Sequence, residues 1–309
     1  MARSIQLPIR FAIGDWRFLT LRIEAAEIGG HFLEQPVSLT DLLAARETQP
    51  ARHAVFGRSI LASHDELIAA TRRGVPLRIL AEYERHYVAL GGTFDEYLAK
   101  FSSRSRSTLT RKVRKFKEAS GGVIDWSTFR TPSDVRPFLS EALPLSTLTY
   151  QHRLIGSGLP ATDGFRERTE ALAAANRFRG WVLRFDGRAI AYIWSEIVGT
   201  TVLYDYVGFD PARSDLSPGT VLQYLVLEQL FEEHTFQYFD FTEGEGSHKQ
   251  FFGTGSCHCA DVLIPGTALG PRFTLASQQF FSKGMHFAAR AAERAGMKAR
   301  LRRLLRGTS

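Results

Sequence analysis

The stretch RGWVLRFDGRAIAYIWSEIVGTTVLYDYVGF, residues 179–209, contains three apolar runs separated by two short turns. Each run is rich in aromatic and β-branched residues, which favour extended strands. Asp186–Gly187 is typical of a tight hairpin, because both positions accept the left-handed backbone that such a turn needs. Gly199–Thr200 is a weaker signal of the same kind. The stretch therefore predicts three consecutive antiparallel strands.

A helix and a further strand follow these three strands. The segment 217–233 opens with Ser217 as the expected N-cap and Pro218 at the first helical position, and apolar residues recur along it at helical spacing. The run FQYFDF, residues 236–241, has the composition of another strand. A strand, a helix and a strand in this order form a crossover, which places the two strands parallel. The sequence thus predicts a mixed, mainly antiparallel sheet flanked by helices.

The composition is that of a globular protein, with 44% hydrophobic and 23% charged residues among 309. No apolar run reaches the roughly 18 residues of a membrane-spanning helix, and the N-terminus lacks the apolar core of a signal peptide. The only cysteines are Cys257 and Cys259, which we expect to be structural. These features predict a reduced, cytoplasmic protein without a metal site.

The net charge of +7 is concentrated in two segments. Residues 100–120 and residues 283–306 each hold eight Lys or Arg and one Glu, so each carries +7 and the remaining chain carries −7. We expect these segments to meet anionic partners, such as CoA phosphates, an acidic carrier protein, tRNA or anionic lipid. The segment 283–306 predicts a basic amphipathic helix that contacts a membrane surface or a carrier protein. The alternative is that both segments are helix faces whose charges are simply solvated.

Three motifs between Thr93 and Pro265 occur in the order of a known family. The first is the basic run from Arg104 to Lys112, and the second is Leu-Ser-Pro-Gly-x-x-Leu at residues 216–222. The third follows the run FQYFDF and consists of Asp240, Gly244, His248, Lys249, Phe251 and Phe252. Together they resemble the cellulose-biosynthesis-type acetyltransferases of the GNAT superfamily, which are distant relatives of the Fem-type aminoacyl transferases.

The resemblance implies an α/β fold of the GNAT type and a division of the chain. Residues 93–268 are expected to form the acyltransferase domain. Residues 1–92 are expected to be a degenerate N-terminal GNAT-like half, and residues 269–309 a basic amphipathic helical tail.

The resemblance also implies a thioester donor, acyl-CoA or acyl carrier protein, and no metal. In the GNAT fold the two parallel strands splay apart, and the acyl-pantetheine arm lies in the gap. The loop before the crossover helix has a single glycine, a proline and Asp215, which departs from the family's usual phosphate-binding loop, so carrier protein or charged tRNA stays open beside CoA. The expected donor-binding residues are Val207, Gly208, Phe209, Arg213, Ser217, Gly219 and Thr220.

Acyl transfer to an amine requires a proton acceptor for the amine and an acid for the departing thiolate. Glu243 is the expected base or amine-positioning group, with Asp240 second. Tyr204 and Tyr206 are expected to face the gap, where either is an acid for the thiolate, and Asp205 is expected to face away. The alternative to a catalytic role is that Asp240 caps the turn and that Glu243 is solvated.

His248 and Lys249 complete the expected site, His248 as a base or proton relay and Lys249 as a cation near a site carboxylate or the intermediate. The prediction is therefore an N-acyltransferase acting on a primary amine of a small molecule, lipid or peptide, with a long acyl chain as one option. The alternatives are a Fem-like aminoacyl-tRNA-dependent transferase and a non-catalytic acyl-ligand binding module. Peripheral contact with the inner face of a membrane through residues 283–306 belongs to the same prediction.

Overall fold

The computed structural model describes residues 3–13, 16–29, 31–49, 54–148, 158–244, 246–268, 273–274 and 277. The chain forms two compact units, one from Met1–Glu82 with Cys259–Ser309 and the other from Tyr83–His258. The boundary falls within two strands, β4 (Arg78–Ala89) and β11 (Gly255–Ile264). Each unit has hydrophobic clusters of its own. The expected GNAT-like nature of residues 1–92 stays a prediction, and the predicted helix at 283–306 lies outside the described residues.

The first unit is a sheet with two helices. Its strand order is β1-β2-β3-β11, where β1 (Arg3–Ile13) and β2 (Trp16–Ile28) form an antiparallel hairpin. The helix α1 (Leu39–Thr48) connects β2 to β3 (Ala54–Leu61), and the two strands pair in parallel. The helix α2 (His64–Arg72) follows β3, and both helices pack their apolar side chains on the sheet.

The second unit has a mixed sheet with the strand order β4-β10-β8-β7-β6-β5, and β9 pairs with β7. All of its strand pairs are antiparallel except β8 with β10, which is the predicted parallel pair. The strands are β5 (Asp125–Phe129), β6 (Phe178–Phe185), β7 (Arg188–Val198), β8 (Thr201–Leu203), β9 (Tyr206–Phe209) and β10 (Tyr238–Asp240). The predicted fold class is confirmed.

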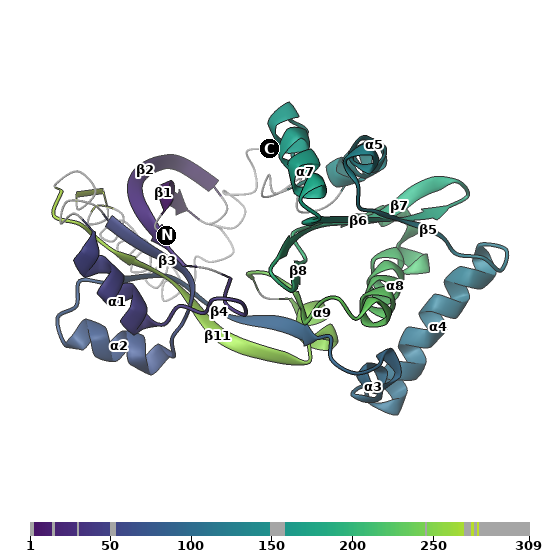
Figure 1. The fold of residues 1–309 in the computed structure, drawn as a ribbon, viewed down its shortest axis with the longest axis horizontal. Helices are drawn as coiled ribbons and strands as arrows, with labels where there is room; N and C mark the ends of the chain where they lie inside the picture. The colour runs from purple at the N-terminus through teal and green to yellow at the C-terminus, as the bar shows by residue number, and fades with distance from the viewer. Residues whose placement is uncertain are drawn as a thin grey trace, which may run out of the picture. The chain divides into compact units, whose positions relative to one another are not determined.

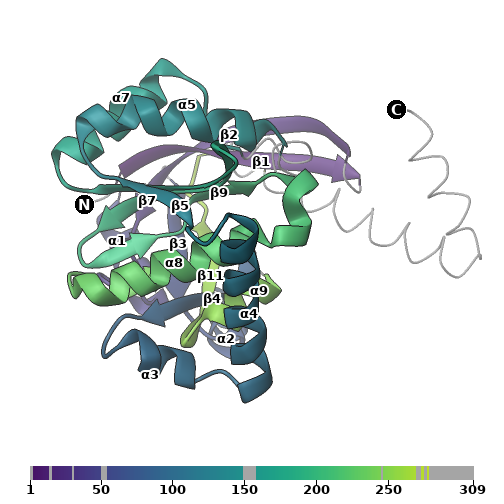
Figure 2. The same cartoon turned by 90° about the vertical axis from the view of Figure 1, so that its right-hand side faces the viewer.

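Helices cover both faces of this sheet (Figure 1 and Figure 2). Alternation along β6 explains the two layers, because Trp181 and Leu183 pack with α8 while Val182 packs with α5 and α7. The helices are α3 (Phe94–Ala99), α4 (Ser103–Ala119), α5 (Pro132–Leu148), α7 (Asp163–Ala174), α8 (Pro218–Glu233) and α9 (Ser247–Phe252). Among them α3 and α4 pack with α8, on the face opposite to α5 and α7.

Three helices of the first hundred residues begin with the same capping motif. Ser38, Ser63 and Thr93 each accept a hydrogen bond from the backbone N–H three residues later. The acidic side chain at that later position bonds back to the cap, which completes a capping box. Ser217 differs, because it precedes α8 in a left-handed conformation with φ of 53° and makes no side-chain cap hydrogen bond.

The prolines of α5 do not interrupt it. A proline inside a helix removes a backbone hydrogen bond, yet α5 continues from Pro132 through Pro137 and Pro144 to Leu148. The helix buries an apolar face against the sheet, including Phe138 at 0% exposure. Tertiary packing of this face therefore outweighs the hydrogen bonds that the prolines remove.

The predicted long strand over residues 202–209 is divided in two. The part β8 pairs with β10, whereas β9 pairs with β7, from Tyr206 opposite Trp194 to Phe209 opposite Ala191. The parallel strands therefore separate after Leu203. The run 236–241 also contributes only three residues, as β10.

A buried ion pair joins β4 to β10. The side chains of Arg85 and Asp240 are 6% and 0% exposed, and Arg85 Nη2 lies 2.6 Å from Asp240 Oδ2. Arg85 Nε donates to both carboxylate oxygens, at 3.2 and 3.1 Å. Burial lowers the pKa of Arg85, but the charge and hydrogen bonds of Asp240, together with the charge of Glu243, outweigh burial and raise it. The pair therefore stays ionised.

We predict that Arg85→Met destabilises the protein by about 3–5 kcal/mol, because it leaves the buried charge of Asp240 without its guanidinium. The double variant Arg85→Met/Asp240→Leu should lose less than either single variant. Urea unfolding of all three, followed by circular dichroism, measures the differences.

The matched control is Arg114→Ala, which removes the exposed pair of Arg114 with Glu118 at 3.6 Å. This change should cost no more than about 0.5 kcal/mol. Equal losses for Arg85→Met and Arg114→Ala would contradict the central role of the buried pair.

Candidate active site

A cavity of about 420 Å³ lies where β9 separates from β10. Its walls come from β7, β9 and the first turns of α8, together with Tyr204, His248 and Phe252. Within the described chain β9 pairs only with β7, so its other edge pairs with no strand. An extended ligand can add to such an edge as a further strand.

A second cavity, of about 460 Å³, adjoins the first. The two share Thr220, His248 and Phe252 as lining residues. The further walls of the second cavity come largely from α4, including Arg104 and Lys112. The apolar first cavity therefore opens toward a basic helix.

Five of the seven predicted donor-binding residues line the first cavity, namely Val207, Gly208, Phe209, Gly219 and Thr220. Arg213 and Ser217 are not among its lining residues. The guanidinium of Arg213 lies 5.2 Å from the ring centre of Phe185, and the two residues line a different cavity. The structure thus brings most of the predicted donor residues together, while their roles stay predictions.

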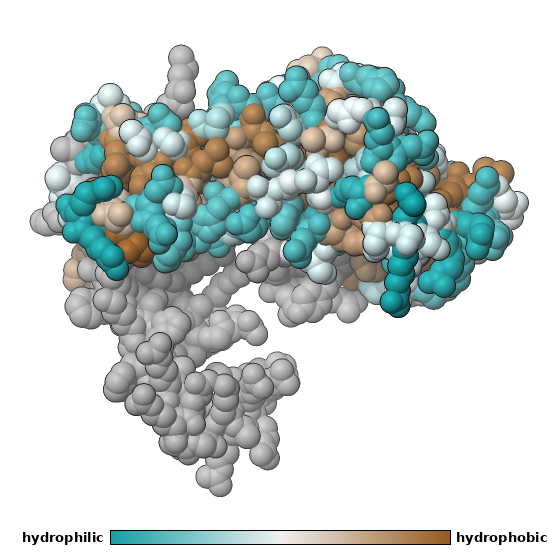
Figure 3. Space-filling model, turned by 90° about the horizontal axis from the view of Figure 1, so that it is seen from below, coloured by the Kyte–Doolittle hydropathy of each residue, from teal (hydrophilic) through white to brown (hydrophobic). Residues whose placement is uncertain are grey.

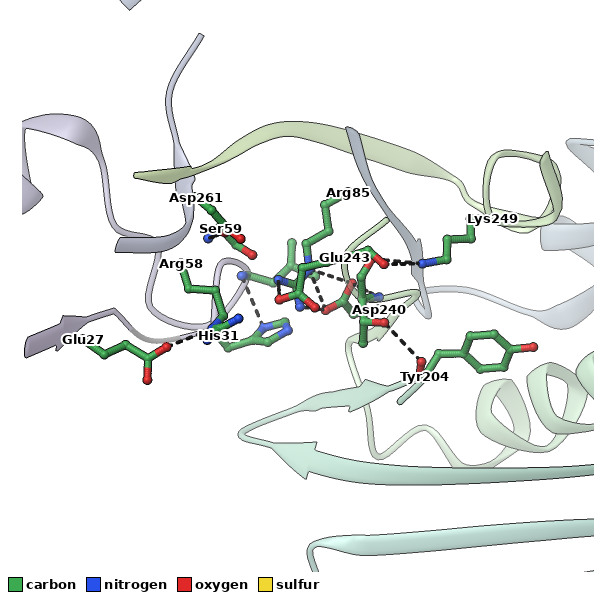
Figure 4. A network of polar contacts seen from close by, with 12 residues as sticks. Glu27, His31, Arg58, Ser59, Arg85, Tyr204, Asp240, Glu243, Lys249 and Asp261 are labelled. Carbon is green, nitrogen blue, oxygen red and sulfur yellow. Dashed lines mark hydrogen bonds and ion pairs between the residues drawn. The ribbon is translucent and has the colours of Figure 1, made fainter. Parts of the chain in front are cut away.

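Arg85 forms ion pairs with Asp240 and Glu243, the two carboxylates that the sequence predicts for the site (Figure 4). Besides Asp240, it contacts Glu243, with Nη1 3.2 Å from Oε1. The side chain of Glu243 is 39% exposed, whereas that of Asp240 is fully buried. Sequence reasoning missed Arg85, because it lies 155 positions from Asp240 and no local pattern marks it.

Lys249 stabilises the turn that follows β10. Its Nζ donates to the backbone oxygens of Glu243, at 2.7 Å, and Thr242, at 3.4 Å. Thr242 has a left-handed backbone with φ of 59°, and its N–H donates to Asp240 Oδ1 at 2.9 Å. Burial lowers the pKa of Lys249, although the charges of Asp240 and Glu243 oppose that change. Lys249 therefore binds carbonyl groups in this structure and fixes the turn.

His248 lines both cavities. Its ring centre lies 6.2 Å from that of Tyr204 and 6.3 Å from that of Phe241. Burial and the nearby charge of Lys249 lower its pKa, so the ring is neutral at neutral pH and can accept a proton. A Cβ at Gly246 would lie 2.9 Å from His248 Cε1, so the absence of a side chain there lets the ring occupy its place.

Tyr204 and Tyr206 point to opposite faces of the sheet. Tyr204 lines the first cavity, and burial raises the pKa of its phenol, which stays protonated at neutral pH. The ring of Tyr206 instead packs against Phe165 and Trp194, each at 5.5 Å. The expectation that both tyrosines face the gap fails because the chain breaks between β8 and β9. A catalytic role for Tyr206 stays a prediction.

Asp205 is a second residue whose setting the sequence did not reveal. Its Oδ2 accepts the backbone N–H of Glu196 at 3.2 Å, and the described residues form no ion pair with it. Asp205 is exposed at the surface, yet nearby protein atoms partly desolvate its carboxyl group. This desolvation, with the charges of Glu196, Asp240 and Glu243, raises the pKa of Asp205 to about 7.

Within the described chain, no helix combines the length and apolarity needed to cross a bilayer. The predicted membrane or carrier contact through 283–306 involves residues outside that part of the chain.

Comparison with known proteins finds a family match that covers most of the residues lining the two cavities. Residues 103–250 match the model of the acetyltransferase (GNAT) domain family. No curated protein matches the sequence. The narrower cellulose-biosynthesis-type resemblance stays a prediction.

Solved structures share the fold at low sequence identity. FemX is 13% identical, with 86% of this chain and 88% of that chain covered and a TM-score of 0.53. The C-terminal domain of a protein described as a lysylphosphatidylglycerol synthetase of Agrobacterium fabrum is 13% identical, covering 82% and 80%, with a TM-score of 0.52. L-PGS from Bacillus licheniformis is 12% identical, covering 88% and 90%, with a TM-score of 0.50. Residues 103–250 thus match an acetyltransferase (GNAT) domain, and the fold of the chain is similar to those of FemX and L-PGS.

Proposed function

We propose that this protein is an N-acyltransferase that moves an acyl group from a thioester to a primary amine. The observation that carries the proposal is the apolar cavity at the separation of β9 from β10, most of whose lining residues lie in the segment that matches the GNAT domain. The free edge of β9 offers backbone groups to the amides of an extended pantetheine arm. The start of α8, with Gly219 and Thr220 in the cavity wall, offers N–H groups to ligand oxygens.

Two residues of the cavity wall and the exposed Asp205, which follows Tyr204 in the chain, divide the proton transfers of this reaction. The amine nitrogen attacks the thioester carbonyl carbon, and the carbon–sulfur bond then breaks. Asp205, with a pKa of about 7, takes the proton that the amine releases. Tyr204, protonated in the cavity wall, gives a proton to the departing thiolate, with neutral His248 beside it as a relay.

The carboxylate of Glu243 positions the acceptor. It is partly exposed and close enough to Asp205 to affect the charge of that residue. A protonated amine is attracted to such a pair of carboxylates before it loses its proton. This arrangement suits a small molecule, a lipid or a peptide with a primary amine.

The donor is acyl-CoA or an acyl carrier protein, because either delivers an acyl-pantetheine thioester. The basic helix α4 walls the second cavity and supplies positive charge for the donor's phosphate or for an acidic carrier surface. In Figure 3 hydrophilic residues extend along the right-hand end, over α3 and α4, with apolar residues between them. Contact of residues 283–306 with a carrier or an anionic membrane belongs to the same proposal.

A Fem-like transferase that uses aminoacyl-tRNA is the second candidate. Two observations favour it, the similarity of the fold to FemX and the basic surface of α4. A non-catalytic module that binds an acyl ligand would hold a thioester without turning it over.

Thiol release from a series of acyl-CoA and acyl-carrier thioesters, measured with a panel of amines, tests the proposed function. Gly219→Ala should raise the Kd of the preferred thioester about tenfold, because the added methyl enters the cavity wall near Phe209. The new Cβ would lie 3.5 Å from Phe209 Cδ1, an ordinary contact, so the protein should fold. Its stability should rise by about 0.4–1 kcal/mol. Unchanged binding in a folded variant would place the donor elsewhere.

The pH dependence of kcat/KM tests the base. The rate should fall as the pH drops below about 7, because protonation of Asp205 removes the acceptor for the amine proton. Asp205→Asn should lower kcat about 100-fold or more and abolish this acidic limb. Glu243→Gln, the matched control, should raise KM and keep the limb. If Asp205→Asn kept both rate and limb, the base would be another group, with His248 next in line.

Reversing charge on α4 tests how the donor is attracted. Arg111→Glu/Arg114→Glu changes two exposed residues outside the cavity lining and should weaken donor binding about tenfold at low salt, with less effect at high salt. The control Arg72→Glu/Arg73→Glu alters the same number of charges at the end of α2 and should have no effect. Loss of tRNA binding alone in the α4 variant would favour the Fem-like candidate.

A further inference from the structure

Gln223 is a buried polar side chain without a partner inside the first cavity. It lies on α8, is 2% exposed and lines the cavity wall. Neither its Oε1 nor its Nε2 makes a hydrogen bond with any described residue. Buried amides of native proteins are almost always paired, because an unpaired donor and acceptor lose their hydration without compensation. This exception is therefore informative.

The surroundings of Gln223 restrict what can pair with it. Its neighbours in the cavity wall include Ala191, Ile193, Val207 and Leu222, which have no polar side-chain atoms. Among the described lining residues there is no Asp, Glu, Lys or Arg, and the pKa shifts of Tyr204 and His248 keep both uncharged at neutral pH. A charged ligand group would lose its hydration here without a countercharge. The partner of Gln223 is therefore neutral.

The cavity has room for both water and ligand. Its volume of about 420 Å³ admits water, which can satisfy Gln223 in the free protein. A ligand that displaces this water without replacing its hydrogen bonds loses affinity. A ligand that places a hydrogen-bond donor and an acceptor beside Gln223 replaces the hydrogen bonds of this water and keeps its affinity.

We propose that Gln223 forms a polar subsite that binds a neutral ligand group able both to donate and to accept a hydrogen bond, an amide or a hydroxyl. This proposal rests on the proposed function, because it assumes a thioester in the cavity. The group has two possible sources, an amide of the donor's pantetheine arm or a hydroxyl on its acyl chain. The subsite disfavours a donor whose acyl group carries a charged ammonium, such as an aminoacyl ester.

Calorimetric titration of Gln223→Leu against chemically matched thioesters tests the subsite. The probes are S-decanoyl-N-acetylcysteamine, which has an amide, S-decanoyl ethanethiol, which has none, and the β-hydroxydecanoyl form of the second. If the amide is the partner, the variant should bind only the first about tenfold more weakly than the wild type. If the hydroxyl is the partner, only the third should weaken.

Two controls make the result decisive. Leu222→Met changes an apolar wall residue with little change of volume and should leave the relative affinities of the probes unchanged. Gln223→Leu should keep or raise Tm, because it removes an unpaired buried amide. Equal affinity of Gln223→Leu and wild type for all three probes would overturn the subsite. Failure of the wild type to bind any thioester would instead overturn the proposed function.

Discussion

The charge of Asp240 is the constraint on which the site depends. It lies at the end of β10 with none of its side chain exposed, and Arg85 of the neighbouring β4 compensates it. The same carboxylate accepts the N–H of Thr242, and the same guanidinium reaches Glu243. One buried ion pair therefore fixes the strand end, the turn and the exposed carboxylate together. Such a pair contributes more to defining one geometry than to net stability, since its desolvation offsets much of its attraction.

The turn in its fixed form also positions α9. Lys249, on α9, binds the carbonyl groups of Thr242 and Glu243, so the helix is tied back to the end of β10. His248 precedes Lys249 and thereby reaches both cavities. Lys100 binds the opposite end of α9 through the carbonyl groups of Phe252 and Gly253. A cation at this end is favourable, because the carbonyl groups there lack helical partners. The placement of His248 is therefore fixed from both ends of a six-residue helix.

The sequence predicts the regular elements well because their signals are local. The Asp186–Gly187 hairpin depends on adjacent residues, and the crossover through α8 on strand and helix patterns that are each local; the structure confirms both. The capping boxes of α1, α2 and α3 are local in the same way. The break between β8 and β9 was missed, because the aromatic alternation continues across it. Its cause is nonlocal: Tyr206 packs with Trp194 in one cluster, whereas Tyr204 packs with Phe239 in the other. The raised pKa of Asp205 and the role of Arg85 depend in the same way on strands distant in sequence.

The start of α8 departs from the pattern of the other helices in an instructive way. Ser or Thr precedes α1, α2, α3, α4 and α7, and in each case its side chain accepts a backbone N–H of the first turn. Ser217 precedes α8 in a left-handed conformation, and its side chain makes no such bond. Uncapped N–H groups weaken a helix, and Pro218 removes only one of them. The destabilised first turn of α8 contains Gly219 and Thr220, and both residues line the cavity. A local rule broken at a cavity wall is expected where a ligand supplies the missing acceptor, and the oxygens of a thioester donor are suited to that role.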